Sequence, residues 1–340
     1  MTGTENKIIT LNNASIGYQQ KGNTSKVVKS GISLHALQGE LVAVIGENGV
    51  GKSTLLKTIA GFQPPVSGDV LIGEKQVNRY PEKDLALMMS FVSTEIIRVP
   101  NLSVFDLVSL GRYPHTNWFG KLLDEDRHII EEAIKAVGLQ GYENRMVNHI
   151  SDGERQKVMI ARSLAQDTAV IVLDEPTAFL DLSNKYGIVH ILHQLAGEKG
   201  KTILFSTHDL TTAIAESDRV WLMLHDSVEQ GAPEDLILNG NFDNLFHNNH
   251  LFFDQEKGDF RIRKQTRRKA VVTGAGIKRD WTVKALERIG FEVVDETHLH
   301  RNESMISIEP ADSRWVLKYL EHSAVFDSLH SVCRYLNNLR

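Results

Sequence analysis

Short runs of apolar residues alternate with stretches of helical periodicity over most of this chain. LVAVIG (41–46), AVIVLD (169–174), TILFST (202–207) and RVWLML (219–224) are typical of strands buried on both faces of a parallel sheet. EDRHIIEEAIKAVG and SNKYGIVHILHQLAGEKG predict helices between them. IITLNNASIGY near the N-terminus alternates, which predicts an edge or antiparallel strand. Residues from about 7 to 260 are therefore predicted to form an α/β domain.

The pattern changes at FRIRKQTRRK (260–269), which carries six basic residues in ten. We favour a solvated linker here, and a lipid or nucleic-acid patch is the alternative. Beyond it, strands are predicted at KAVVTGAG, FEVVDE, SMISIEP and RWVLKYL, and a helix is predicted at WTVKALERIG. A closing helix is predicted at FDSLHSVCRYLNNL, with Asp327 as its N-cap. The predicted organisation is an α/β domain over 1–258, a basic linker over 259–269 and a small α+β domain over 270–340.

Composition narrows the class of protein. An apolar share of 41% and a charged share of 24% are those of a soluble globular protein, and a net charge of −5 gives no general attraction to nucleic acid or anionic lipid. The single cysteine, Cys333, excludes an internal disulfide and a multi-cysteine metal site. The sequence contains neither signal-peptide features at its start nor the roughly 18 consecutive apolar residues of a membrane span. We therefore expect any role at a membrane to depend on a partner.

GENGVGKST (46–54) contains the pattern G-x-x-x-x-G-K-[ST], formed by Gly46, Gly51, Lys52 and Ser53. It follows a predicted buried strand and precedes a helical stretch, a context that favours a phosphate-binding loop over a merely glycine-rich turn. The glycines let backbone amides surround a β-phosphate. The Lys52 ammonium can reach the β- and γ-phosphates, and the Ser53 hydroxyl can bind Mg²⁺. ATP with Mg²⁺ is the predicted ligand.

Two acids follow a second buried strand in AVIVLDEP. Asp174 stands at the carboxyl end of that strand, where a carboxylate can hold Mg²⁺ through water, and Glu175 can orient or deprotonate the attacking water. A plain strand end and turn is the alternative, which the phosphate loop makes the weaker interpretation. LFSTHD ends a further strand with His208, which can contact a γ-phosphate at the same edge. Glu175, His208 and Lys52 are the candidate catalytic residues.

In the order and spacing of these motifs, the chain resembles the ATP-binding subunit of an ABC transporter over about residues 7–258. The resemblance implies a P-loop NTPase fold of ABC type, with a mixed sheet core and a helical subdomain at about 95–165. It also implies that Tyr18 stacks on adenine, that Asp181 in FLDL communicates across a dimer, and that His208 is the switch histidine. The residues implied in nucleotide binding are Tyr18, Gly46, Glu47, Asn48, Gly49, Val50, Gly51, Lys52, Ser53, Thr54, Ser151, Gly153, Glu154 and Asp181.

ISDGERQ, which precedes the Asp–Glu strand, matches the signature sequence of this family. The resemblance implies that two subunits hold two ATP molecules head to tail, and that each signature turn caps the γ-phosphate on the opposite subunit. Ser151 offers a hydroxyl, Gly153 an open amide, and the helix from Glu154 its positive end. A local role for Ser151 as a helix N-cap is compatible with this one.

Two positions depart from the family pattern. Asp152 replaces a usual glycine, and repulsion from the triphosphate would weaken dimer closure unless Asp152 faces solvent or meets a base such as Arg155 or Lys157. Thr94, followed by Glu95, aligns with a glutamine that contacts Mg²⁺ and senses the membrane partner. Threonine can still bind a metal-held water, with shorter reach. The predicted metal ligands are Ser53, Asp174 and Thr94.

LGRYPHTNWFG resembles the subgroup that serves importers of iron–siderophore complexes, haem and cobalamin. Tyr113, Trp118 and Phe119 are either ordinary aromatics or a docking patch for a partner's helix. The resemblance implies a homodimer of ATPase subunits at the cytoplasmic face of the inner (plasma) membrane, bound peripherally to permease subunits. We expect a substrate-binding protein upstream of the permease, and we expect no nucleic acid as a partner.

The predicted function is an ATP-hydrolysing subunit that powers import of an iron chelate (siderophore), haem or cobalamin. One alternative is a soluble ABC-type ATPase in translation or DNA repair. The chain contains one nucleotide-binding cassette and no heptad stretch, which argues against this alternative. Another is a nucleotide-binding sensor with little hydrolysis, which Thr94 and Asp152 suggest. The C-terminal domain is expected to be regulatory or to mediate self-association, and His298 and His300 are a weak candidate metal pair.

Overall fold

The computed structural model describes residues 6–19, 25–93, 101–116, 120–246, 251–255, 258–262, 268–294, 306–310, 314–319 and 322–338. The chain divides into two compact units, each with its own hydrophobic core. The larger comprises Met1–Asn248 and Phe253–Phe260, and the smaller comprises Asn249–Phe252 and Arg261–Arg340. The linker predicted over 259–269 is shorter in the structure, because residues 259–262 and 268–269 belong to strands, and the remaining residues 263–267 lie outside the described residues.

A central sheet in the larger unit is built from the apolar runs predicted as buried strands. Among the described residues it has six strands, in the order β10-β9-β3-β8-β7-β6. All neighbours are parallel except β10, which is antiparallel to β9. The carboxyl ends of β3, β8 and β7 therefore meet at one edge. The bounds are Leu41–Gly46 (β3), Met89–Val92 (β6), Val170–Leu173 (β7), Thr202–Ser206 (β8), Arg219–Met223 (β9) and Val228–Gly231 (β10).

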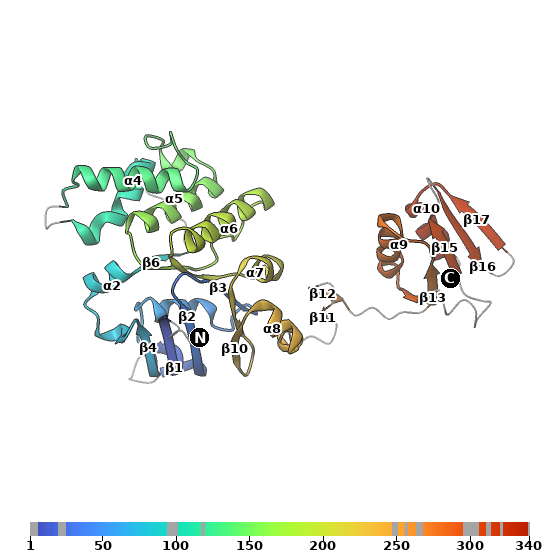
Figure 1. Cartoon of the computed structure of the whole chain (residues 1–340), viewed down its shortest axis with the longest axis horizontal. Coiled ribbons are helices and arrows are strands. Elements are labelled where there is room, and N and C mark those ends of the chain that lie inside the picture. The colour runs from blue at the N-terminus through green and yellow to red at the C-terminus, as the bar shows by residue number, and fades with distance from the viewer. Residues whose placement is uncertain are drawn as a thin grey trace, which may run out of the picture. The chain divides into compact units, whose positions relative to one another are not determined.

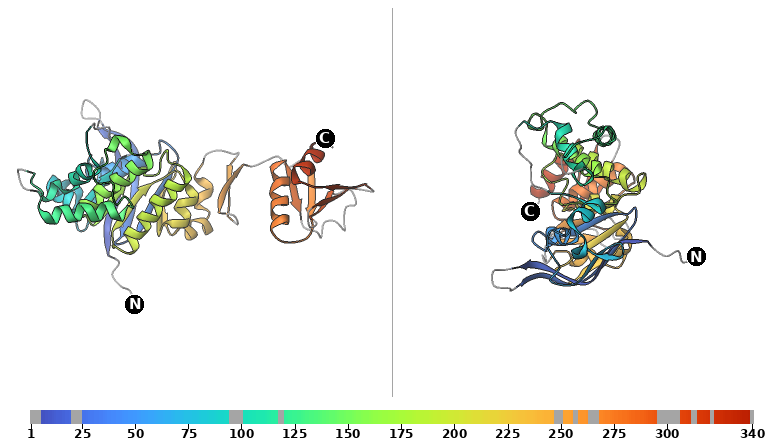
Figure 2. Two further views of the ribbon diagram at one scale, coloured as in Figure 1. Left: turned by 90° about the horizontal axis from the view of Figure 1, so that it is seen from above. Right: turned by 90° about the vertical axis from the view of Figure 1, so that its left-hand side faces the viewer.

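Most helices of the larger unit, α1 and α2 excepted, cover one side of this sheet. α3, α4 and α5 pack on one another within the region predicted to be a helical subdomain, and α6 packs against α5. Figure 1 and Figure 2 show these green helices gathered on one side of the unit. No described helix is long and apolar enough to cross a membrane. The bounds are Lys52–Ile59 (α1), Glu82–Met88 (α2), Val104–Ser109 (α3), Asp124–Ala136 (α4), Asp152–Ala165 (α5), Leu182–Gly197 (α6), Leu210–Glu216 (α7) and Pro233–Leu238 (α8), with 3-10 turns at Val77–Arg79 (η1), Leu110–His115 (η2), Val147–His149 (η3) and Asn241–Asn244 (η4).

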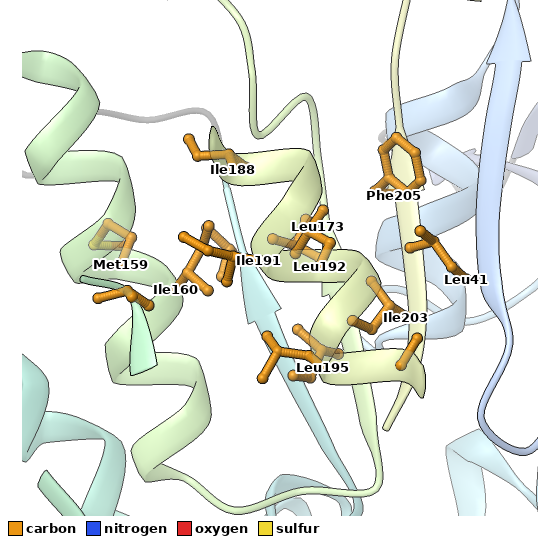
Figure 3. Packing of buried hydrophobic residues seen from close by; sticks show 14 of the residues in the cluster. Leu41, Met159, Ile160, Leu173, Ile188, Ile191, Leu192, Leu195, Ile203 and Phe205 are labelled. Atoms are coloured by element: carbon orange, nitrogen blue, oxygen red, sulfur yellow. The ribbon is translucent and has the colours of Figure 1, made fainter. Parts of the chain in front are cut away.

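Both faces of the central sheet are buried, which explains why its strands are apolar throughout. Leu41 and Ile45 of β3 join the core on the helical side, whereas Val42 and Val44 join the core on the opposite side. Figure 3 shows the helical side, where residues of α6 lie between those of α5 and those of β3, β7 and β8.

The alternating N-terminal segment forms an antiparallel strand, as predicted. β1 (Lys7–Gln19) pairs with β2 (Ser25–Leu37) and with β4 (Ser67–Ile72), which also pairs with β5 (Lys75–Gln76). Together with α1, this sheet packs on the face of the central sheet opposite the helices (Figure 1). β2 was not among the predicted strands, although its buried Ile32, Leu34 and Ala36 alternate with more exposed residues.

A buried ion pair ties η2 to α4 and α5. Arg112 Nε donates to the carboxylate of Asp126 at 2.8 Å, and both side chains are less than a tenth exposed. Arg112 Nη1 also donates to the carbonyl oxygen of Ala165 at 3.0 Å. The backbone amide of Leu123 donates to Asp126 at 2.9 Å, and this bond, followed by the Arg112 pair, holds the pKa of Asp126 below its usual value.

The variant Arg112→Met is expected to lower the free energy of unfolding by about 3–5 kcal/mol, because it leaves the carboxylate of Asp126 buried without its cation. The double variant Arg112→Met/Asp126→Asn should regain at least half of that loss, since an asparagine oxygen still accepts from Leu123 and carries no charge. Urea unfolding of the three proteins provides the measurement. A double variant as unstable as Arg112→Met would show that the buried charge is not the cause.

The smaller unit has its helices on one face of a sheet, as the α+β pattern predicts. Among its described residues the strand order is β14-β13-β15-β16-β17, with β13 parallel to β14 and β15 and the remaining pairs antiparallel. Leu286 of α9, Leu317 of β16 and Leu336 of α10 share one core. The bounds are Arg268–Val272 (β13), Phe291–Val294 (β14), Ile306–Pro310 (β15), Trp315–Tyr319 (β16), His322–Phe326 (β17), Ile277–Arg288 (α9) and Leu329–Asn338 (α10), preceded by the hairpin of Leu251–Asp254 (β11) and Asp259–Ile262 (β12).

The predicted N-cap of the last helix is wrong by one residue. The hydroxyl of Ser328 accepts from the backbone amide of Ser331 at 3.2 Å, which is the capping interaction. Asp327 instead pairs with Arg314 at 2.9 Å. Aspartate and serine are equally good caps, so the sequence alone did not decide between these neighbours.

Candidate functional site

The loop after β3 has the strand–loop–helix arrangement that the sequence predicts, with Lys52 as the first residue of α1. Gly51 has φ +112°, a backbone conformation that side chains disfavour. A Cβ on Gly46 would lie 2.6 Å from the carbonyl oxygen of Met223 in β9. Both glycines are therefore required by the backbone itself.

The Lys52 side chain folds back over this loop and is almost fully buried. Its ammonium donates to the carbonyl oxygens of Gly46 at 2.8 Å and Glu47 at 3.1 Å. Burial lowers the pKa of Lys52 below its usual value, and the carboxylates of Glu175 and Asp174 act in the opposite direction. The Lys52 ammonium is thus held at the loop, close enough to Glu175 and Asp174 for their charges to affect its pKa.

Hydroxyl groups connect the phosphate loop to the acids after β7. Ser53 Oγ donates to the carboxylate of Asp174 at 3.1 Å, and Ser206 Oγ donates to the same oxygen at 2.7 Å. The amide of Glu175 donates to Ser206 Oγ at 2.9 Å. Ser206 was not among the predicted site residues, although it is the last residue of β8 and its place at this edge could have indicated it.

The proximity of Ser53 and Asp174 fits the predicted magnesium site. Mg²⁺ prefers oxygen ligands, and a hydroxyl and a carboxylate lie here side by side at the start of α1. The third predicted ligand, Thr94, lies outside the described residues, as does its neighbour Glu95. Within the described part of the chain no cluster of three or more histidine, cysteine or acidic side chains could hold a metal, and His298 and His300 fall outside that part.

The turn after β7 is conformationally strained. Glu175 and Phe179 have φ of 47° and 62°, values in the left-handed region that residues other than glycine rarely adopt. Such strain costs roughly 1–3 kcal/mol per residue and concentrates at functional sites. His208 follows β8 at the same edge, where it is exposed and lines a cavity with Glu47 and Asn48.

The signature segment forms the N-terminus of α5, with Ser151 as its N-cap. Ser151 Oγ accepts from the amide of Glu154 at 3.2 Å, while the Glu154 carboxylate accepts from the amide and the hydroxyl of Ser151 at 2.8 Å each. These bonds, together with one from the hydroxyl of Tyr142 at 2.7 Å, hold the pKa of Glu154 below its usual value. The predicted local capping role of Ser151 is confirmed, and its role toward a second subunit stays a prediction.

Asp152 both faces solvent and contacts a basic residue, the two features that would reduce its repulsion of a triphosphate. Its side chain is 70% exposed, and its carboxylate accepts from Arg155 Nη1 at 2.5 Å. The predicted contact with a base is therefore present for Arg155.

Asn184 connects the signature turn to the loop that contains Asp181. Asp181 is the N-cap of α6 and accepts from the amide and the side chain of Asn184 at 2.9 Å each, bonds that lower its pKa. A Cβ on Gly153 would lie 2.5 Å from Cγ of Asn184, so any larger residue at this position would require the Asn184 side chain to move. No pattern in either segment predicts the contact between Asn184 and Gly153.

The remaining predicted residues lie around the phosphate loop, in η2 or outside the described residues. Tyr18 is half exposed, and its hydroxyl lies 2.5 Å from that of Thr54 in α1, while Gly49 and Val50 complete the loop. Tyr113 in η2 is 78% exposed. Trp118 and Phe119, the other aromatics of the predicted docking patch, lie outside the described residues.

Two family models match the chain. Residues 30–178 match the model described as ABC transporter, and residues 267–337 match the one described as iron ABC transporter C-terminal domain. The first match ends after the Asp174–Glu175 pair, and the second spans most of the described smaller unit.

Similar proteins have related descriptions. An uncharacterised ABC transporter ATP-binding protein of Methanocaldococcus jannaschii is 38% identical over 268 residues, which cover 78% of this chain and 91% of that protein. The iron(3+)-hydroxamate import ATP-binding protein FhuC of Bacillus subtilis is 38% identical over 192 residues, 56% of this chain and 71% of that protein. A dimeric structure of a bacterial ABC transporter cassette superposes with a TM-score of 0.58 at 27% identity, covering 66% of this chain and 98% of that one.

Proposed function

Because this chain belongs to the family of ABC transporter ATP-binding proteins, which are ATPases coupled to transport, we propose that it drives import of an iron–siderophore complex. The observation that carries this cargo class is the match of residues 267–337 to the C-terminal domain of iron ABC transporters. The iron(3+)-hydroxamate import protein of Bacillus subtilis supports the same class. These similarities favour a siderophore over haem and cobalamin.

The described side chains suit ATP hydrolysis, which needs a water aligned with the γ-phosphate and a group that takes its proton. In our proposal Lys52 exchanges the carbonyl oxygens of Gly46 and Glu47 for phosphate oxygens, which are stronger acceptors. The Glu175 carboxylate orients the water and accepts its proton, and His208 donates to the γ-phosphate. Mg²⁺ bound through Ser53 and Asp174 would neutralise charge on the phosphate oxygens.

A second copy of the chain completes the site in this proposal. Ser151 is exposed at the N-terminus of α5, so its hydroxyl can face a γ-phosphate held by the other copy, whereas Gly153 is buried in this structure and Asn184 would have to move before the Gly153 amide could do the same. The dimeric state of the similar bacterial cassette supports a homodimer. In a two-fold dimer the contact occurs twice, so two ATP molecules are enclosed.

Membrane permease subunits are the proposed partners, contacted at the cytoplasmic face of the membrane. Leu110 and Tyr113 of η2 are 55% and 78% exposed, and Leu87 of the adjacent α2 is 37% exposed. Apolar side chains exposed together favour a protein interface. We propose that this surface receives a cytoplasmic helix of the permease, with a substrate-binding protein delivering the chelate on the other side.

Co-purification from detergent-solubilised membranes, followed by reconstitution into liposomes, tests the function. We expect the permease that accompanies the chain to import a radiolabelled ferric siderophore only when ATP is enclosed on the cassette side. Binding of ATP without turnover in the complete complex would favour the nucleotide sensor, and association with ribosomes or DNA instead of a permease would favour the soluble ATPase. Uptake of haem or cobalamin in place of ferric siderophore would overturn the proposed cargo.

The variant Asp152→Asn is expected to strengthen ATP-driven dimerisation by about 2- to 5-fold at low salt, the range typical of one exposed charge. The change removes the carboxylate that neutralises Arg155, so the Arg155 cation is left unpaired near the γ-phosphate of the other copy, and the size of the side chain is kept. Sedimentation at 20 mM and 500 mM salt should show the difference shrinking as salt rises. Asp124→Asn, an exposed acid in the first turn of α4, is the matched control and should change nothing.

A further inference from the structure

A cavity of about 520 Å³ opens beside the phosphate loop, at the carboxyl edge of the central sheet. Its polar rim consists of Gly46, Glu47, Asn48 and His208, and its apolar wall consists of Ile45, Leu210, Leu245 and Phe246. The apolar wall does not suit a triphosphate. A cavity of roughly 150 Å³ already holds a benzene-sized ring, so this one has room for an aromatic side chain.

The wall at Phe246 is supported by residues that follow the nucleotide-binding motifs. The ring of Phe246 packs edge-on against Phe260 at a centroid distance of 4.8 Å, and Phe260 packs against Phe253 at 5.0 Å. Phe253 stacks in turn on the buried ring of Phe242 at 5.0 Å. Aromatic contacts of this kind fix ring positions, so the wall is preformed.

Phe179 is an aromatic side chain exposed to solvent over its whole surface. It stands between Glu175 and Asp181 in the strained turn after β7, with φ 62°. Its neighbour Leu180 packs on the core, which fixes the turn while the Phe179 ring points away from it. A large apolar ring held outward by a strained backbone is typical of a residue with a partner elsewhere.

The strand order places this ring and the cavity at the ends of neighbouring strands. The cavity lies at the ends of β3 and β8, the Phe179 turn lies at the end of β7, and these parallel strands end at one edge. A two-fold axis that passes near the end of β8 would bring the β7 turn of one copy onto the β3 loop of the other. The same contact would then form twice, as a two-fold interface requires.

We infer that, in the ATP-bound homodimer, the Phe179 ring of each copy inserts into the cavity bounded by Leu210, Leu245 and Phe246 of the other copy. This inference rests on the proposed function, because it requires the dimer. It places an aromatic side chain of one copy beside His208 and Asn48 of the other. Dimer closure would then depend on Phe246 and the aromatic rings that support it, which lie outside the nucleotide-binding motifs.

A double-mutant cycle tests the pairing, with Glu175→Gln as the parent in every protein so that ATP persists. We expect Phe179→Ala and Phe246→Ala each to weaken ATP-driven dimerisation by roughly 10- to 30-fold, as for a residue that carries much of an interface. The double variant should be weaker than either single variant by less than 3-fold. Sedimentation gives the affinities, and Phe62→Ala, which removes an exposed ring elsewhere, is the control. Independent, multiplying effects would overturn the inference.

Cross-linking keeps the test valid if Phe246→Ala fails to fold. In a Cys333→Ser background, Phe179→Cys and Leu210→Cys together should give a product of two chains with a short bis-maleimide when ATP is present. Its absence while the dimer forms would overturn the contact and leave the proposed function intact. A parent that binds ATP yet stays a single copy would overturn both.

Discussion

Replacing Glu175 by glutamine is expected to lower the rate of ATP hydrolysis about 100-fold or more while ATP still binds. Glutamine keeps the size of the side chain but cannot accept a proton from water at neutral pH. The glutamate raises the pKa of Lys52 through its charge, so its removal also takes a negative charge away from the phosphate site. We therefore expect the affinity for ATP to be equal or higher.

Phosphate release from the complex with its permease measures the rate, and a fluorescent ATP analogue measures binding. Glu198→Gln is the matched control, because this exposed glutamate ends α6 away from the phosphate loop. A Glu175→Gln protein that hydrolyses ATP as fast as the parent would show that another group takes the proton. Equal losses in rate and affinity would instead indicate a binding role for Glu175.

The parts of the fold that were predicted correctly are those in which short-range pattern and burial agree. The strands around Val42 and Val172 are buried on both faces, so continuous apolar runs identified them. The strand–loop–helix at Lys52 was also predictable, because Gly46 and Gly51 are required by the backbone itself. In such cases local sequence carries the structural information.

What escaped prediction depends on contacts between distant segments. Asn184 lies against Gly153, and nothing in its own segment indicates this partner. Ser206 bonds to both Asp174 and Glu175, and its segment indicates only that it ends a strand at the same edge. β17 was missed as well, since Ala324, Val325 and Phe326 are apolar in succession and do not alternate with polar residues, although Val325 is exposed. Each of these features appears only when separate strands and helices are brought to one edge or face.

Replacing Lys52 by alanine is expected to weaken ATP binding about 10- to 100-fold. A charge-assisted hydrogen bond contributes roughly 1.5–3 kcal/mol, and each 1.4 kcal/mol is a factor of ten in affinity. Lys57→Ala, an exposed lysine in the last turn of the same helix, should leave ATP affinity unchanged. Titration with ATP at the same salt concentration measures the affinity of both variants. Equal losses of affinity would show that general surface charge, and not a contact between Lys52 and phosphate, causes the effect.

The pH dependence of the parent separates a phosphate-binding lysine from a merely structural one. Phosphate oxygens raise the pKa of a bound ammonium, whereas burial lowers the pKa of Lys52 in the free protein below 10.5. The contribution of Lys52 to ATP affinity should therefore be complete below its free pKa and be lost as the pH rises from that value through the higher pKa of the ATP-bound form. The difference between parent and Lys52→Ala isolates this contribution from other groups that titrate in the same range. A constant difference across that range would mean that the Lys52 charge does not meet the phosphates, and that its bonds to Gly46 and Glu47 serve the loop alone.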